Sequence, residues 1–226
     1  MKLLSKENIK NSKVIMRVDF NVPISKGHIK DKTRILNVLP TIRHLIKNNN
    51  AIILISHLGR PIGKDDEYSL RPIHKELSKM LDSPVFFSDK ISGIQFSENK
   101  KMLKPGDLLL MENIRFWSEE KIGHEKNILF AQELAQHMDF FINEAFACSH
   151  RKSASMTILP MCFTNKKLAG FLLEKEIAHL KKIKYNTLSP FTAIIGGAKI
   201  STKIKLIEKL LIICDHIILG GAMAHT

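Results

Sequence analysis

The sequence predicts an α/β fold in which a doubly wound parallel sheet is flanked by helices, followed by a connecting helix and an incomplete second α/β domain. Two observations lead to this prediction. Short apolar runs recur along the 226 residues and are nearly continuous, as expected for strands that are buried on both faces. Segments with apolar residues at helical spacing lie between these runs, and such strand–helix alternation is typical of parallel sheets.

The predicted strands lie at 13–20, 51–57, 83–88, 106–113, 138–145, 191–197 and 215–221. The predicted helices lie within 32–48 and at 70–81, 125–137, 171–184 and 199–212. Ser69 precedes the second helix, which has Pro72 in its first turn, so Ser69 is the predicted N-cap. Pro40 lies inside the first helical pattern, and we expect the regular helix to begin there because proline disrupts a helix interior.

A change of pattern near residues 160–190 marks a predicted domain boundary. An irregular segment is followed by an amphipathic helix, a loop and two units in which a strand runs into Gly-Gly. We therefore assign residues 1–167 to an N-terminal domain, 168–184 to an interdomain helix and 185–226 to an incomplete C-terminal domain. Two strands and one helix make a poor independent core.

Composition places the chain among globular proteins, with 44% hydrophobic and 25% charged residues. The start of the chain has only a two-residue apolar stub, and no apolar run has the length of a membrane span, so a cytoplasmic protein with no membrane role is expected. Three widely spaced cysteines, Cys148, Cys162 and Cys214, fit a reducing compartment and suggest no metal site. The net charge of +13 suggests a polyanion partner, but the lysines are spread along helix faces with few aromatic residues between them. Nucleic acid is therefore not the expected partner.

Polar and basic side chains follow four of the predicted strands, at the point where each strand ends. Because the carboxyl ends of parallel strands meet at one edge of a sheet, these side chains are expected to form one electropositive crevice. The planar guanidinium of arginine suits carboxylate and phosphate, so the crevice is predicted to bind a small anion with both groups. The alternative is that some of these residues belong to solvated loops or to salt bridges with Glu112 or Glu144. The candidate residues are Asp19, Asn21, Arg34, His57, Arg60, Arg115, His150 and Arg151.

The predicted C-terminal domain carries a second candidate site. Backbone N–H groups at a glycine-rich turn and a helix start can hold phosphate, and lysines four residues apart on one helical face add positive charge. The segment does not match the P-loop pattern, so alone it is weak evidence. Together with the arginine crevice it indicates phosphoryl transfer by positioning and charge stabilisation, with no obvious need for a general base. The candidate residues are Gly196, Gly197, Lys199, Lys203, Gly220 and Gly221.

A series of motifs occurs in the order and rough spacing of one known family. These motifs are RVDFNVP, SHLGRP, SLRPI, ENIRF, NEAF with SHR, AGFLLEKE, GGAKISTKI and LGGAMAHT. With these motifs, which run from residue 17 to the C-terminus, the chain resembles phosphoglycerate kinase. The resemblance implies a Rossmann-like N-terminal domain that binds 3-phosphoglycerate and a C-terminal domain that binds ADP or ATP with Mg²⁺. The implied reaction is the glycolytic, reversible phosphoryl transfer between 1,3-bisphosphoglycerate and ADP.

The resemblance also implies roles for the candidate residues at matched positions. Arg34 and Lys203 correspond to catalytic residues that steady the transferring phosphoryl group from its two sides, and Lys199 corresponds to a contact with nucleotide phosphate. The four glycines correspond to the nucleotide side. The implied substrate residues are Asp19, Asn21, His57, Arg60, Arg115 and Arg151, with His150 adjacent.

The chain departs from the family pattern in three ways. Ser153 stands where the family usually has histidine, and Thr202 stands where it commonly has aspartate. The resemblance also stops roughly halfway through the family's extent, before the later nucleotide segments, the acidic residue expected to hold Mg²⁺ and the C-terminal tail. Two interpretations therefore stay open: a phosphoglycerate kinase recorded as a truncated chain, or a non-catalytic 3-phosphoglycerate-binding fragment that needs the missing half. Full-length family members are expected to be monomeric.

Overall fold

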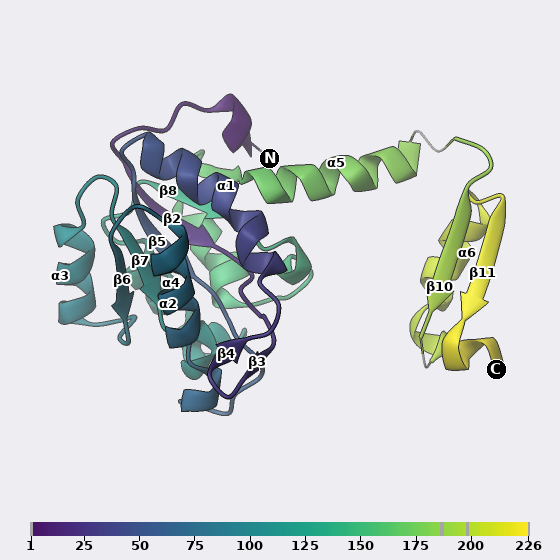
Figure 1. Cartoon of the computed structure of the whole chain (residues 1–226), viewed down its shortest axis with the longest axis horizontal. Coiled ribbons are helices and arrows are strands. Elements are labelled where there is room, and N and C mark those ends of the chain that lie inside the picture. The colour runs from purple at the N-terminus through teal and green to yellow at the C-terminus, as the bar shows by residue number, and fades with distance from the viewer. Residues whose placement is uncertain (1, 186–187, 198, 226) are drawn as a thin grey trace. The chain divides into compact units, whose positions relative to one another are not determined.

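A computed structural model describes residues 2–185, 188–197 and 199–225 of the chain (Figure 1). The chain divides into two compact units, Met1–Lys175 and Glu176–Thr226. The boundary between them falls inside one helix, α5 (Phe171–Tyr185). Among the described helices, none has the length and apolar character that crossing a membrane requires.

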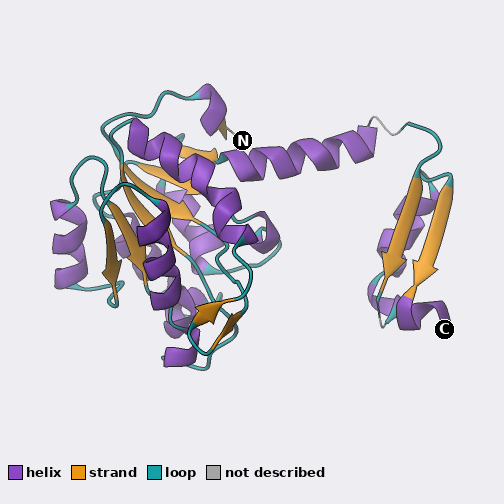
Figure 2. Ribbon diagram, in the orientation of Figure 1, coloured by secondary structure: helices purple, strands orange, loops and turns teal. Residues whose placement is uncertain are grey.

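The first unit is built on a seven-stranded sheet in which every pair of neighbouring strands is parallel (Figure 2). The strand order is β1-β9-β8-β2-β5-β7-β6, which confirms the predicted parallel α/β fold. After β2 the chain continues to β5 on one side, and it later returns to β8 on the other side of β2. The strands are β1 (Lys2–Leu3), β2 (Lys13–Arg17), β5 (Ala51–Ile55), β6 (Val85–Ser88), β7 (Leu108–Met111), β8 (Phe140–Asn143) and β9 (Lys167–Ala169).

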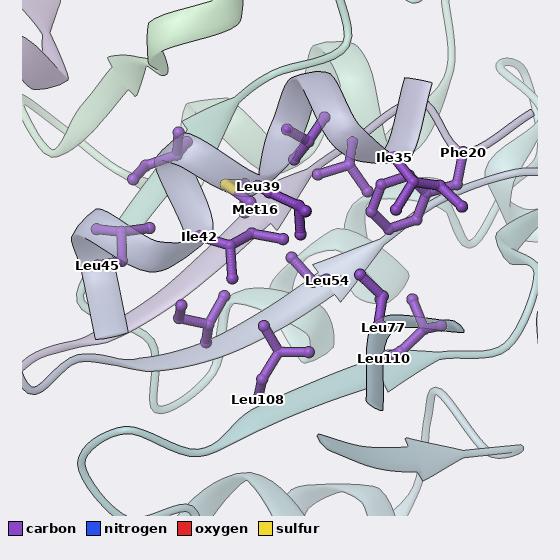
Figure 3. Packing of buried hydrophobic residues seen from close by; sticks show 14 of the residues in the cluster. Met16, Phe20, Ile35, Leu39, Ile42, Leu45, Leu54, Leu77, Leu108 and Leu110 are labelled. Atoms are coloured by element: carbon purple, nitrogen blue, oxygen red, sulfur yellow. The ribbon is translucent and has the colours of Figure 1, made fainter. Parts of the chain in front are cut away.

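Helices cover both faces of this sheet, because its strands are apolar on both faces. On one face, Met16 and Leu54 pack with α1 and α2 in a cluster that also contains Leu39 (Figure 3). The neighbouring strand residues Ile15 and Ile53 point to the other face, where they pack with α3 and α4. The helices are α1 (Thr33–Lys47), α2 (Arg71–Met80), α3 (Ile94–Met102) and α4 (Asn127–Ala135).

Short elements shape the loops of the first unit. A small antiparallel hairpin pairs β3 (Ile24–Ser25) with β4 (His28–Ile29). The other short elements are 3₁₀-helices, except for η6, which is a π-helix. They are η1 (Leu4–Lys6), η2 (Asp66–Tyr68), η3 (Ile114–Phe116), η4 (Ser118–Glu120), η5 (Phe146–Cys148), η6 (Ala154–Ile158) and η7 (Leu159–Cys162).

Two predictions about helix starts in the first unit are wrong. Helix α1 begins at Thr33 and continues through Pro40, instead of starting there. Pro40 has no N–H to donate to the carbonyl four residues earlier in the helix, and because Pro40 is exposed, this carbonyl lies on the solvent side. The opposite face of α1 is buried, and its packing keeps the helix in place. In α2 the N-cap position is Leu70, not Ser69. Ser69 still accepts a hydrogen bond from the N–H of Arg71, the first helical residue, at 3.2 Å.

The start of α5 is fixed by a buried carboxyl group. Glu144, just after β8, accepts hydrogen bonds from the N–H groups of Leu172 at 3.2 Å and Leu173 at 2.9 Å, and from the hydroxyl of Thr41 in α1. A negative group at a helix N-terminus is favourable because the first N–H groups have no partner within the helix. Burial nevertheless raises the pKa of Glu144, and these hydrogen bonds oppose that shift. Glu144 therefore joins β8, α1 and α5.

In its described residues, the second unit contains the C-terminal part of α5, two parallel strands and helix α6. It contains β10 (Thr192–Gly196), η8 (Ile200–Thr202), α6 (Ile204–Leu211), β11 (His216–Gly220) and η9 (Gly221–His225). Several of its large apolar side chains are exposed, among them Ile194, Leu211 and Ile212. Ile195 and Met223 are its buried apolar residues among those described.

Candidate anion-binding site

The loops that follow β2, β5, β7 and β8 meet at the carboxyl edge of the large sheet and form a cleft of about 650 Å³. This edge includes the point where the strand order reverses, which is where open α/β sheets bind ligands. Three of the predicted arginines line the cleft. The lining residues are Arg17, Arg60, Pro61, Arg115, Trp117, Glu120, Lys121, Ile122, Cys148, Arg151, Lys152, Ser153 and Met156.

Asp19, Arg34 and His57 lie next to this cleft and do not line it. Arg34 Nη1 is 2.5 Å from Asp19 Oδ2, so the two side chains form an ion pair. A carboxylate oxygen of Asp19 and a ring nitrogen of His57 lie within 4.8 Å of the sulfur of Cys148, which lines the cleft. The predicted residues Asp19, Arg34 and His57 therefore lie together at the edge of the cleft.

The loop that carries Arg60 is held by two other candidate residues. Asn21 Oδ1 accepts a hydrogen bond from the N–H of Gly59 at 2.8 Å, and Arg115 Nη1 donates to the carbonyl oxygen of Gly59. Gly59 has a φ of +58°, and a Cβ there would overlap the ring of Tyr68. Asn21 and Arg115 thus fix the loop that presents Arg60. His150 is different, because it is exposed and does not line the cleft.

Positive charge dominates the cleft. Among the described residues, the ion pairs within 4.0 Å include Arg34 but none of Arg17, Arg60, Arg115 and Arg151. Burial lowers the pKa of Arg115, and the neighbouring charges of Arg151 and Arg17 lower it further. Burial also raises the pKa of the Cys148 thiol, although the arginines oppose that shift. The cleft is therefore electropositive, as the sequence predicts for this edge of the sheet.

Glu112 and Glu144 do not serve as partners of these arginines. Glu112 accepts hydrogen bonds from the hydroxyl of Ser69 at 2.7 Å and from the N–H of Leu70 at 2.8 Å, at the start of α2. Glu144 has the corresponding role at the start of α5. Both acids are used by helix N-termini, which leaves the arginine charge of the cleft available to a ligand.

His57 is 3% exposed, and its pKa is lowered to about 2. Burial is the largest cause, followed by the positive charge of Arg17 and of Arg115, Arg151 and Arg34. His57 is consequently neutral throughout the physiological pH range.

We expect the low pKa of His57 to make stability depend on pH. Below about pH 6.5 the unfolded chain binds a proton at this residue and the folded chain does not, so the free energy of unfolding falls as pH falls. The expected contribution is up to about 1.4 kcal/mol per pH unit. Urea unfolding of the wild type and of His57→Gln between about pH 5 and about pH 7 measures it. The variant should lose this dependence, while the contribution of Glu144, which has the opposite sign, stays in both proteins. Equal pH slopes would contradict the prediction.

The candidate residues of the second unit are arranged differently from the prediction. Lys199 and Lys203 do not share one face of an α-helix, because both lie outside α6. Lys199 has extended backbone angles before η8, and Lys203 is the residue between η8 and α6. The hydroxyl of Thr202 donates to the carbonyl oxygen of Lys199 at 2.9 Å, a local bond that competes with regular helix.

The glycines of the second unit lie close to one another, and Gly197 lies close to Lys203. A Cβ on Gly197 would come within 2.9 Å of Lys203 Cε, and one on Gly221 within 3.1 Å of the carbonyl oxygen of Gly197. Gly196 and Gly220 end the two paired strands, β10 and β11. The predicted glycines and Lys203 are therefore brought together at the carboxyl edge of the small sheet.

Among the described residues, one group of side chains has the types and spacing of metal ligands: Asp19, His57 and Cys148. It lies among Arg17, Arg34 and the other arginines, whose field disfavours a cation. Its mixed oxygen, nitrogen and sulfur donors also do not match the oxygen ligands that Mg²⁺ prefers. The described residues thus do not form a fitting site for Mg²⁺.

Comparison with known proteins agrees with the motifs and the fold. The family model of phosphoglycerate kinase matches residues 4–226. The chain belongs to the phosphoglycerate kinase family. It is 43% identical to a phosphoglycerate kinase from Wolbachia sp. subsp. Drosophila simulans, with 100% of this chain and 56% of that protein aligned. It is 45% identical to a phosphoglycerate kinase from Chlamydia trachomatis serovar L2, with 97% of this chain and 55% of that protein aligned.

Solved phosphoglycerate kinase structures show the same architecture. The structure from Pyrococcus horikoshii OT3 matches with a TM-score of 0.88 at 33% identity, covering 100% of this chain and 56% of that one. The structure from Coxiella burnetii matches with a TM-score of 0.82 at 36% identity, covering 98% and 55%. The chain thus spans about half the length of the phosphoglycerate kinases that it matches.

The cleft also contains residues that the sequence did not single out as candidates. Arg17 is the last residue of β2, and its position directly after three buried apolar residues is a signal that could have identified it. Glu120 and Cys148 lie in 3₁₀ turns, for which the sequence carries no comparable signal. Ser153, at the usual histidine position of the family, lines the cleft and pairs with Lys121 in an isolated β-bridge.

Proposed function

We propose that this chain functions in the phosphoglycerate kinase reaction, the reversible transfer of a phosphoryl group between 1,3-bisphosphoglycerate and ADP that gives 3-phosphoglycerate and ATP. The observation that carries the proposal is the cleft of the first unit, where Arg60, Arg115 and Arg151 meet with no ion-pair partner within 4.0 Å among the described residues. A triose that carries a phosphate and a carboxylate is complementary to such a surface. Membership of the family supports this choice of substrate.

In this proposal, 3-phosphoglycerate binds at the carboxyl edge of the large sheet. Arginines 60, 115 and 151 hold its anionic oxygens with charge-assisted hydrogen bonds. Asp19, Asn21 and His57 orient the molecule at the edge of the cleft, and His150 lies on the exposed loop beside it. The first unit, which contains the predicted domain 1–167, is thus the proposed substrate domain.

The proposed chemistry needs charge stabilisation more than proton transfer. The carboxylate of 3-phosphoglycerate is already ionised at pH 7, so no base has to activate it. Negative charge on the transferring phosphoryl group is the main barrier, and fixed cations lower it. Arg34 is 48% exposed at its side chain although it pairs with Asp19, so its guanidinium is accessible for this role.

The second unit is the proposed nucleotide side. The backbone of Gly196, Gly197, Gly220 and Gly221 leaves room for close approach of phosphate, and Lys199 and Lys203 supply charge. Lys203 is the proposed contact to the transferring phosphoryl group. Mg²⁺ would arrive as part of the substrate MgATP or MgADP, and no step is assigned to it because the described residues do not form its site.

A second candidate function is 3-phosphoglycerate binding without turnover. It is favoured by the coverage, since the chain spans 55–56% of its relatives, and by the second unit, which has only two strands in its described part. A two-stranded unit with exposed apolar side chains is marginal as an independent nucleotide site.

A coupled assay of phosphoryl transfer from MgATP to 3-phosphoglycerate separates the two candidates. Turnover by the purified 226-residue chain that is lost in Lys203→Ala would support the catalytic function. Saturable binding of 3-phosphoglycerate without turnover would support the binding function. If neither is found, both candidates are wrong.

A further inference from the structure

The imidazole of His57 is approached at one of its two nitrogens. Arg17 Nη2 lies 3.2 Å from His57 Nδ1, and Cys148 Sγ lies 3.9 Å from the same nitrogen. A guanidinium has donors and no acceptor, so Nδ1 must be the acceptor in its contact with Arg17. An imidazolium carries protons on both nitrogens and could not accept this bond. The geometry therefore requires a neutral ring with its proton on Nε2.

Nε2 is the nitrogen of His57 that stays available to a ligand. The described residues offer it no hydrogen-bond partner. No side-chain nitrogen or oxygen of a described residue is both fully buried and unpartnered, so Nε2 keeps some access to solvent. His57 can therefore present an N–H donor from the edge of the cleft.

Arg17 is held in place by a serine. Arg17 Nε donates to Ser155 Oγ at 3.1 Å, and Nη1 donates to the carbonyl oxygen of Val18. These bonds at the other side of the guanidinium aim Nη2 at His57. Without an acceptor at Ser155 Oγ, the side chain of Arg17 would lose the contact that sets its orientation.

Ser155 is in turn oriented by a carboxylate. Its hydroxyl donates to Glu120 Oε1 at 2.7 Å, which leaves the lone pairs of Oγ for Arg17. Its backbone N–H donates to Glu120 Oε2 at 2.8 Å, so both carboxylate oxygens are occupied. The carboxylate only accepts and the guanidinium only donates, so the direction of each hydrogen bond from Glu120 through Ser155 and Arg17 to His57 is determined.

Glu120, Ser155, Arg17 and His57 form a hydrogen-bonded relay, and all four side chains are almost completely buried. Hydrogen bonds and charges act more strongly in this buried environment than in water. The exposed fractions are 5% for Glu120, 0% for Ser155, 2% for Arg17 and 3% for His57. The other charged or titratable groups around His57 are Asp19, Arg34, Arg115, Cys148 and Arg151. The positive charge of these neighbours also disfavours protonation of His57 to an imidazolium.

We propose that Glu120, Ser155 and Arg17 are positioning residues that hold His57 as the neutral tautomer with its proton on Nε2, so that His57 donates a hydrogen bond to an anionic oxygen of the ligand. The identity of the ligand rests on the proposed function, but the tautomer is a property of the free protein. A neutral donor keeps its proton at every physiological pH, so this contact does not weaken as pH rises through 6.5, the ordinary pKa of histidine.

Nitrogen NMR of the ¹⁵N-histidine-labelled chain tests the tautomer directly, with the His57 signals assigned by their absence in His57→Gln. We expect the free wild type to show one species between about pH 5 and about pH 8, with a protonated Nε2 and an unprotonated Nδ1. A protonated Nδ1, or a titration of His57 in this range, would overturn the proposal whether or not 3-phosphoglycerate binds.

Variants test the part played by the relay. Ser155→Ala removes the acceptor for Arg17, so both neutral tautomers of His57 should appear. Ser149→Ala should leave one tautomer, because the hydroxyl of Ser149 donates to the carbonyl of Ala145 and is not bonded to Arg17. If Ser155→Ala does not fold, Glu120→Gln provides the test, because its amide places a donor within reach of Ser155 and should also give mixed tautomers. An unchanged single tautomer in a folded Ser155→Ala or Glu120→Gln variant would show that the relay does not hold His57.

Addition of inorganic phosphate to the wild type tests the donor role. The protonated Nε2 signal should shift on saturation while Nδ1 changes less. A shift confined to Nδ1 would contradict a donor role for Nε2. Because this arm uses phosphate, its outcome does not depend on the identity of the natural substrate.

Discussion

Arg34→Ala is expected to lower kcat for phosphoryl transfer by about a thousand-fold or more, with a much smaller effect on the affinity for 3-phosphoglycerate. An arginine that stabilises charge on a transferring phosphoryl group contributes about 10³–10⁵ in rate. The side chain of Arg34 is half-exposed and is held by Asp19, so its loss should change the site without unfolding α1. The measurement is kcat in the coupled assay, using a chimaera in which the part of the Wolbachia relative beyond the matched segment continues this chain.

Arg43→Ala provides the matched control for Arg34→Ala. Arg43 lies on the same helix and donates to the carbonyl oxygen of Met80 at 3.1 Å, away from the cleft. Its replacement removes the same charge and should leave kcat unchanged. If Arg34→Ala and Arg43→Ala had equal rates, Arg34 would have no role in the transition state.

Gly170→Ala is expected to destabilise the first unit by about 3 kcal/mol. A Cβ at this position would overlap the carboxyl group and Cγ of Glu144. That carboxyl group cannot move freely, because it is buried and binds the start of α5 and the hydroxyl of Thr41. The substitution must therefore either break these hydrogen bonds or displace α5. Thermal unfolding followed by circular dichroism should show a decrease in Tm of about 10 °C.

The control for this substitution is a glycine with open space around it. Gly220 has no positive φ, and a Cβ there would meet nothing within 4 Å. Gly220→Ala should leave the Tm of the first unit unchanged. A Gly170→Ala protein as stable as the Gly220→Ala protein would mean that Glu144 is not a fixed element of the fold.

The parallel sheet and its electropositive edge were predictable because both depend on strong, local signals. Strands buried on both faces are continuous apolar runs, and the residues that follow them meet at one edge in any parallel sheet. The prediction therefore placed Arg60, Arg115 and Arg151 together without knowledge of the strand order. The exposed position of His150 could not be foreseen, since it depends on the path of a single loop.

The elements that the sequence analysis missed have weak patterns. Helix α3 buries Phe96 and the fully buried Lys100, whose amino group reaches the carbonyl oxygen of Glu133, so its buried face is not apolar. Strand β9 has only three residues and lies in a segment interpreted as irregular, yet it pairs with β8 and β1. In both cases tertiary contacts, which no sequence window contains, decide the structure.

Calorimetric titration of the 226-residue chain with 3-phosphoglycerate tests the central claim, that the cleft of the first unit is a substrate site. The fluorescence of Trp117, the single tryptophan, reports the same event because its side chain lines the cleft. We predict saturable binding at one site that weakens by about 10- to 100-fold in Arg115→Met, since charge-assisted hydrogen bonds contribute about 1.5–3 kcal/mol. Arg71→Met removes one positive charge outside the cleft and should bind like the wild type. Failure to saturate, or equal losses in the two variants with a steep dependence on salt, would instead indicate non-specific attraction of anions to a basic surface and contradict the claim.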